Sequence, residues 1–124
     1  MNITGFNPLI ISQDADNIIK LFEELGFEKR HTLTANTEKG DISFVRMKNP
    51  DGFAVDVTFM SELPQDMTVI RMNVNDFNDG YRTLTERGFR NYYGDLVMES
   101  DSTKMAFMQS PSGFIFELIQ HIKK

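Results

Sequence analysis

The chain has 124 residues, of which 40% are hydrophobic and 25% charged, and its formal net charge is −5. This length corresponds to one domain, and the composition is that of ordinary globular proteins. The absence of cysteine excludes disulfides, thiolate metal sites and a cysteine nucleophile. An acidic surface repels nucleic-acid phosphates, and no apolar run approaches the length of a membrane span. We therefore expect a cytoplasmic protein with neither nucleic acid nor membrane as a partner.

The first half of the chain is expected to form one strand, one helix and three more strands. Residues 7–11 read as a short apolar strand. Apolar residues then recur every three or four positions up to Gly26, a pattern that predicts an amphipathic helix with Asp14 or Asp16 as its N-cap. Segments rich in Phe, Val, Ile and Thr, separated by turn sequences, predict the remaining strands. These strands are residues 27–36, 41–47 and 53–60.

The second half repeats this order. A strand is expected at 69–74 and a weaker helix at about 76–87, because Gly80 in its interior lowers helix propensity by about 1 kcal/mol relative to alanine. The strands that follow are expected at about residues 89–99, 104–109 and 114–121.

Short internal repeats support two related modules. The sequence Asn-Pro-Asp-Gly-Phe at 49–53 returns as Ser-Pro-Ser-Gly-Phe at 110–114, which is 61 residues later. Gly26-Phe27 returns as Gly88-Phe89 at nearly the same offset. Repeats in the same order and at nearly one spacing indicate two copies of a βαβββ unit.

Two βαβββ modules of this length, each with such a turn before its last strand, resemble the vicinal oxygen chelate superfamily. This superfamily includes glyoxalase I, extradiol dioxygenases, fosfomycin resistance enzymes and bleomycin resistance proteins. The resemblance rests on residues 9–14, 25–27, 49–52, 69–76 and 110–118. It implies an α+β fold in which the curved mixed sheets of the two modules form a cup. We expect one domain over residues 1–124, with module one at about 5–60, a linker at 61–66 and module two at about 67–124.

The resemblance also locates the positions where metal-dependent superfamily members hold their ion. One ligand lies at the start of each module's first strand and one on each module's last strand. By spacing, these positions are Asn7, Val69, Asp56 and Glu117. Valine has no donor atom and the imidazoles that suit transition metals are missing, so we expect no metal cofactor. If there is one, it is a weakly held divalent ion on Asp56 and Glu117, as carboxylates suit Mg²⁺ or Mn²⁺.

Strand alternation predicts which polar side chains face the cup. A few polar groups among apolar walls are typical of a small-molecule site. Glu117 either contacts a ligand or pairs with Arg71, because a buried carboxylate needs a partner, and both readings stay open. Arg71 is the best candidate for contacting an anionic or carbonyl-bearing ligand. The expected ligand-binding residues are Asn7, Asp56, Arg71, Asn73 and Glu117.

Two functions remain open on the sequence. The first is a protein similar to the bleomycin resistance branch, with a degenerate metal site, that binds a small molecule in the cup without a metal. The alternative is a divalent-metal-dependent lyase, isomerase or dioxygenase that uses Asp56 and Glu117. The resemblance also implies a homodimer. The sequence assigns no catalytic residue, and it leaves open whether the modules pair within a chain or across a dimer.

Overall fold

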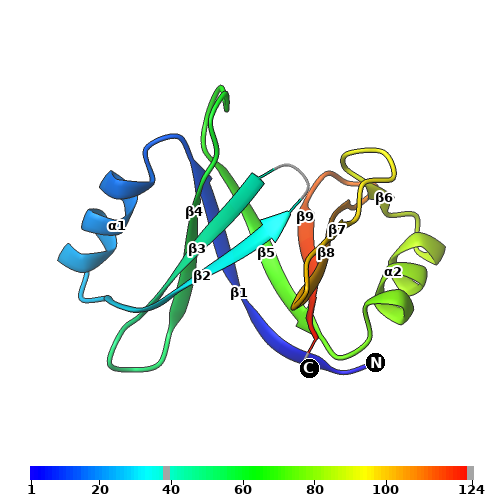
Figure 1. Ribbon diagram of the computed structural model, residues 1–124, viewed down its shortest axis with the longest axis horizontal. Helices are drawn as coiled ribbons and strands as arrows, with labels where there is room; N and C mark the ends of the chain where they lie inside the picture. Colours follow the sequence, from blue (N-terminus) through cyan, green and yellow to red (C-terminus); the bar gives the residue numbers. More distant parts are fainter. Residues whose placement is uncertain (38–39, 123–124) are drawn as a thin grey trace.

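The computed structural model describes residues 1–37 and 40–122, and it leaves the side chains of residues 33–42 outside this description. Lys123 and Lys124, the end of the expected second module, also lie outside it. Each half has one strand, then one helix, then further strands, which is the order that the sequence predicts (Figure 1). The elements are β1 (Ile3–Ser12), α1 (Ala15–Glu24), β2 (Glu28–Thr37), β3 (Gly40–Lys48), β4 (Ala54–Phe59), β5 (Met67–Val74), α2 (Phe77–Glu86), β6 (Arg90–Asn91), β7 (Met98–Glu99), β8 (Thr103–Gln109) and β9 (Ile115–His121).

The described strands form one mixed sheet in the order β2-β3-β4-β1-β5-β9-β8-β6, with β7 paired to β8. The two central strands, β1 and β5, are antiparallel, and Asn7 lies opposite Arg71. On each side of this pair, the first strand of that half runs parallel to its last strand, β1 beside β4 and β5 beside β9. The two halves therefore pair within one chain.

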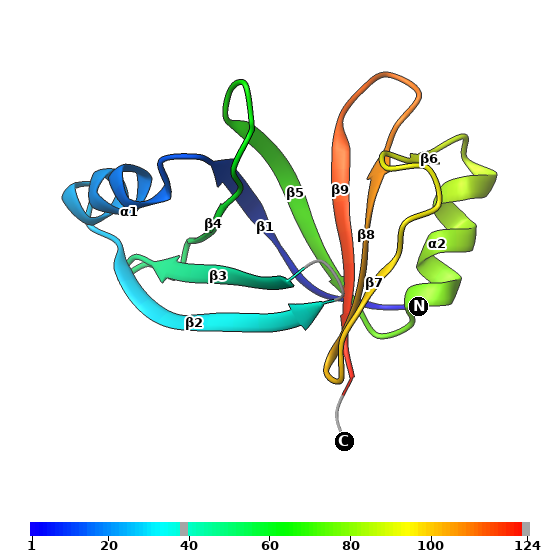
Figure 2. The same ribbon diagram turned by 45° about the horizontal axis from the view of Figure 1, so that its top comes forward.

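The sheet curls into the expected cup, with α1 and α2 on its outer side at opposite ends (Figures 1 and 2). Each helix covers its own half of the outer face, α1 over an apolar cluster that includes Met47 and Val57 and α2 over one that includes Met72 and Leu118. Both helices are ten residues long, so no helix of the described chain could cross a bilayer. The inner face holds a third apolar cluster, which consists of Leu9, Ile11, Phe44, Val69, Met105, Phe107, Ile115 and Ile119.

Gly80 lies where α2 comes closest to the sheet. A Cβ atom at this position would lie 3.1 Å from Cδ1 of Leu118 and 3.2 Å from Sδ of Met1. The glycine that weakens the helix by propensity therefore permits its close packing on β9.

The expected strand at 89–99 is wrong. Only the short strands β6 and β7 form there, and the chain turns between them. The side chain of Asn91 stabilises this turn, because its Oδ1 accepts from the Tyr93 amide at 3.0 Å and its Nδ2 donates to the Leu96 carbonyl at 2.8 Å. Local side-chain bonds of this kind compete with a strand ladder.

The two helices also begin differently. Asp76 caps α2, since its Oδ1 accepts from the Asp79 amide at 3.1 Å. Asp14 is the N-cap residue of α1, but its side chain makes no capping bond and accepts instead from the Asn17 side chain at 2.6 Å. Of the two expected N-cap residues, Asp14 and Asp16, Asp14 holds the position, and the expected capping bond is absent.

Candidate binding site in the cup

Strand register brings the expected site residues to the inner face of the sheet. Asn7 of β1 lies opposite Arg71 of β5, and Arg71 lies beside Glu117 of β9. Asp56 of β4 is the neighbour of Leu9 on β1. All five expected residues are buried: Asn7, Asp56, Arg71, Asn73 and Glu117.

Arg71 joins the two halves of the cup. Its side chain is 1% exposed and extends from β5 to the N-terminal half, where Nη1 donates to Oδ2 of Asp56 at 2.9 Å. On the other side, Nε lies 3.0 Å from Oε1 of Glu117. The guanidinium carbon lies 4.4 Å from the centre of the Phe44 ring, which supports its flat face. A single cationic group thus lies between the two carboxylates.

Asp56 is satisfied by a second guanidinium as well. Arg46 of β3 binds it in a bidentate manner, with Nε to Oδ1 and Nη2 to Oδ2 both at 2.7 Å. Nδ2 of Asn7 donates to the same carboxylate at 3.1 Å. Burial alone would raise the pKa of Asp56, but the Arg46 bonds, the charge of Arg71 and the Asn7 bond together lower it. Asp56 is therefore ionised at neutral pH.

The pKa of Glu117 is shifted in the opposite direction. It is fully buried, and burial raises its pKa to about 7 against the opposing charge of Arg71, with the charge of Asp56 adding to the rise. Its contact with Nε of Arg71 is short but lacks hydrogen-bond geometry. Within the described chain, four buried atoms of the cup have no hydrogen-bond partner: Nε of Arg71, Oδ1 of Asn73, and Oε1 and Oε2 of Glu117.

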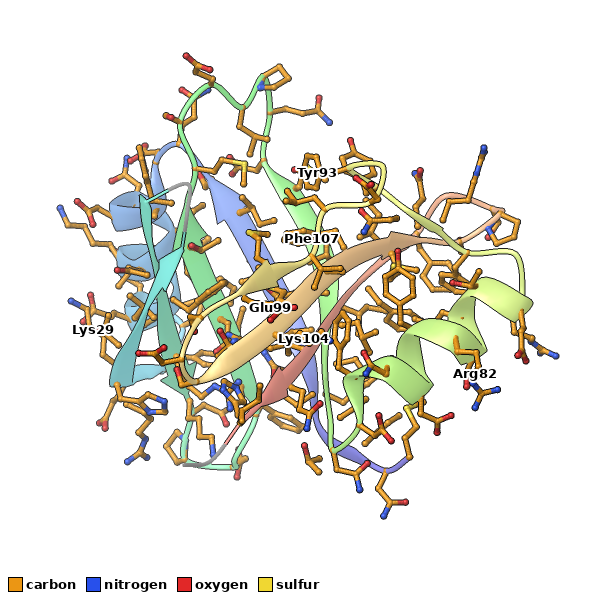
Figure 3. The ribbon with its side chains drawn as sticks, turned by 45° about the vertical axis from the view of Figure 1, so that its right-hand side comes forward. Lys29, Arg82, Tyr93, Glu99, Lys104 and Phe107 are labelled. Carbon is orange, nitrogen blue, oxygen red and sulfur yellow. The ribbon has the colours of Figure 1, made fainter. Side chains whose placement is uncertain are left out.

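Arg46 was not identified from the sequence. Pairing the residues of the two strands step by step from the turn would have placed it opposite Asp56. The turn closes through a bond between Asn49 and Phe53, and the same hairpin register places Arg46 opposite Asp56. The equivalent count in the C-terminal half pairs Phe107 with Glu117. The rings of Phe107 and Tyr93 pack edge to face, with their centroids 5.8 Å apart. Figure 3 labels both residues, which lie on neighbouring segments.

Four partly buried side chains pack against the apolar cluster inside the cup. They are Met60, Leu63, Met67 and Met98. Leu63 belongs to the expected linker, and its carbonyl accepts a short hydrogen bond from the side chain of Gln13. Methionine is unbranched and adapts its shape to what it covers. The cup is thus filled with apolar side chains around a charged centre.

These residues do not fit a metal ion. Both oxygens of Asp56 are held by guanidinium groups, and Val69 belongs to the apolar cluster. A metal would also have to lie beside Arg71, whose positive charge would repel it. Among the side chains that the structure describes, no three from His, Cys, Asp or Glu gather closely enough to hold an ion.

Solved structures share this architecture at low sequence identity. A glyoxalase/bleomycin resistance protein/dioxygenase superfamily member from Vibrio splendidus 12B01 is 18% identical with a TM-score of 0.57, over 96% of this chain and 99% of that one. A methylmalonyl-CoA epimerase is 20% identical with a TM-score of 0.62, over 94% of each chain. Glyoxalase I from Zea mays is 14% identical with a TM-score of 0.66 over 98% of this chain, which spans 44% of the maize protein.

The chain therefore has the fold of the glyoxalase/bleomycin resistance/dioxygenase superfamily, as its repeats and turns predict. No protein-family model matches the sequence, and no curated protein matches it. A common fold supports many different activities, so function has to be argued from the cup.

Proposed function

We propose that this protein binds a small organic molecule in its cup and does so without a metal ion. The observation that carries the proposal is the position of Arg71. Its guanidinium lies between Asp56 and Glu117, where metal-dependent proteins resembling this one would need a cation. An internal cation therefore already pairs with both carboxylates.

The alternative, a metal-dependent lyase, isomerase or dioxygenase using Asp56 and Glu117, requires Arg71 to move away from both. Breaking a buried ion pair by removing one partner destabilises proteins by about 3–5 kcal/mol. A weakly bound Mg²⁺ or Mn²⁺ would have to offset that loss. We therefore place metal binding second.

Two features support binding of an organic molecule. The cup combines buried polar atoms that lack a partner with an apolar surround, which is the usual composition of a small-molecule site. The residues packed against its apolar cluster include Met60, Met67 and Met98, whose flexible side chains can move aside. Binding in this filled cup requires that movement, so ligand and methionines compete for the same space.

Thermal denaturation of chelator-treated protein tests both parts of the proposal. We expect Mg²⁺, Mn²⁺, Fe²⁺, Co²⁺, Ni²⁺ and Zn²⁺ to leave the midpoint unchanged, and some members of a panel of apolar organic molecules to raise it. A ligand at a hundredfold excess over its dissociation constant stabilises the native state by about 2.7 kcal/mol.

Two variants locate the binding. Met67→Lys places a charge against the inner apolar cluster and should abolish the shift. Leu21→Lys, on an exposed position of α1, should retain it. A saturable metal shift that disappears in Asp56→Ala would overturn the proposal in favour of the metal-dependent alternative.

We also propose that the protein forms a homodimer in the cytoplasm. Phe6 and Phe114 are 60% and 49% exposed on the outer face, where both contact Phe116. Large exposed aromatic side chains are common at protein interfaces. Sedimentation equilibrium should give twice the chain mass, and Phe6→Ser should lower it, whereas a monomer at high concentration would contradict this.

A further inference from the structure

The unpartnered atoms of the cup are mostly acceptors. Three of the four are oxygens, namely Oδ1 of Asn73 and both carboxylate oxygens of Glu117. Burying a polar atom without a partner is destabilising, so each such atom needs an explanation. Oε1 of Glu117 is ion-paired with Nε of Arg71, so the acceptors that a donor from outside could satisfy are Oε2 of Glu117 and Oδ1 of Asn73.

The charges around these oxygens disfavour a charged ligand. Two guanidinium groups, Arg46 and Arg71, face two carboxyl groups, Asp56 and Glu117, so the ionic charges are close to balanced. An ammonium group would add a third cation beside the guanidiniums. A carboxylate would place its oxygens against acceptors that already lack donors. An uncharged donor avoids both repulsions.

The side chain of Asn73 packs closely against the backbone at Gly5. A Cβ atom at Gly5 would lie 2.8 Å from Nδ2 of Asn73, so only glycine leaves room for this amide as it stands. Asn73 follows Arg71 by two positions on β5, and Glu117 lies beside Arg71 on β9. Asn73 and Glu117 are therefore diagonal neighbours on the inner face, close enough for one polar group to reach both.

Building on the proposed function, we propose that the ligand is uncharged at this point. It presents a hydroxyl or amide N–H group whose hydrogen is shared between Glu117 and Oδ1 of Asn73 in a three-centre bond. The rest of the ligand is apolar and displaces the methionines that pack against the inner cluster.

Four probes with one apolar body test this assignment by calorimetric titration. They are 4-butylphenol, which donates, 4-butylanisole, which cannot, 4-butylbenzoate, an anion, and 4-butylbenzylamine, a cation. A hydrogen bond to a charged group contributes about 1.5–3 kcal/mol, so the phenol should bind roughly 10- to 100-fold more tightly than the anisole. Both ions should bind more weakly than the phenol.

A protein variant completes the comparison. Asn73→Leu removes one acceptor and should weaken the phenol several-fold while leaving the anisole unchanged. Asn17→Leu, at an exposed position of α1, is the matched control and should change neither. The four-probe comparison on the unaltered protein remains decisive if Asn73→Leu fails to fold.

The outcomes separate this inference from the proposed function. If the anisole binds as tightly as the phenol, or if either ion binds best, the cup binds organic molecules but the donor assignment is wrong. If the phenol is preferred and Asn73→Leu leaves that preference intact, donation to Asn73 is wrong. If none of the four probes binds, both the proposed function and this inference fail.

Discussion

Asp56 and Glu117 occupy equivalent places in the two halves of the cup, 61 residues apart, yet they behave in opposite ways. The pKa of Asp56 is lowered and that of Glu117 is raised to about 7. Burial raises the pKa of both groups, but at Asp56 the bonds from Arg46 and Asn7 and the charge of Arg71 outweigh it, whereas at Glu117 burial outweighs the charge of Arg71. The cross-strand neighbours differ accordingly, because Arg46 lies opposite Asp56 and Phe107 lies opposite Glu117.

The central strands carry a second asymmetry. Arg71 is the side chain that crosses the cup. Asn7 pairs with Arg71 and Leu9 pairs with Val69, so Leu9 is the residue of β1 that corresponds to Arg71 of β5. Both carboxylates therefore pair with Arg71, and among the described side chains Asp56 alone has a second guanidinium partner. Arg71 thus links the chemistry of the two halves.

Removal of the Arg71 guanidinium should cause the largest loss in the free energy of unfolding. Arg71→Met leaves Glu117 without its cation and Asp56 with Arg46 alone, so we expect a loss of about 3–5 kcal/mol in the free energy of unfolding. Urea denaturation at neutral pH measures it. Arg82→Met on α2, whose side chain projects away from the protein in Figure 3, is the control and should change stability little. A small loss for Arg71→Met would mean that the guanidinium does not bridge the halves.

Removing the charge of Asp56 and that of Glu117 in separate variants should lower the free energy of unfolding by different amounts. Asp56→Asn leaves two guanidiniums facing a neutral group and should lower stability by about 2–3 kcal/mol. Glu117→Gln replaces a group that is partly protonated at pH 7 and should lower it by less than about 1 kcal/mol. The same denaturation measurement compares them, and equal losses would contradict the difference in their environments.

Stability should also depend on pH through Glu117. Its pKa rises from an ordinary 4.5 to about 7 on folding, so the folded state holds more protons between these values. The free energy of unfolding therefore falls as pH rises through that window, and we expect about 2 kcal/mol more stability at pH 5.5 than at pH 8 from this group. Because the pKa of Asp56 is lowered on folding, this group stabilises the protein above its ordinary pKa, and that stabilisation is lost as pH falls below it.

Glu117→Gln is the control for this pH dependence. Denaturation of both proteins across the range isolates the contribution of Glu117, because the other titrating groups are shared. A variant with the same slope as the unaltered protein would show that Glu117 titrates normally.

The helix caps provide the smallest effect. Asp76→Ala removes a side-chain bond to the Asp79 amide and should lower stability by about 1 kcal/mol. Asp14→Ala removes no such bond and should change stability by less than about 0.5 kcal/mol. Thermal or urea denaturation distinguishes them, and equal losses would mean that Asp14 caps α1 in solution.

Much of the fold could be predicted because its signals are local. The period-2 pattern of β1 and β5 indicates which residues share the inner face, and the turns at Asn49 and Ser110 mark the hairpins. The strand expected at 89–99 was wrong for an equally local reason, since the side chain of Asn91 bonds to the turn that interrupts it. Propensity counts apolar and aromatic residues and misses such a bond.

The sequence by itself determined the repeat, the superfamily fold, the polar set inside the cup and the poor metal-ligand chemistry of Asn7 and Val69. Only the tertiary structure decided which charges meet. Arg71 and Asp56 lie on β5 and β4, which are not adjacent in the sheet, and curvature brings their side chains together. Burial and neighbouring groups then shift the pKa values of Asp56 and Glu117 in opposite directions, because the free energy of a charge depends on its surroundings more than on its residue type.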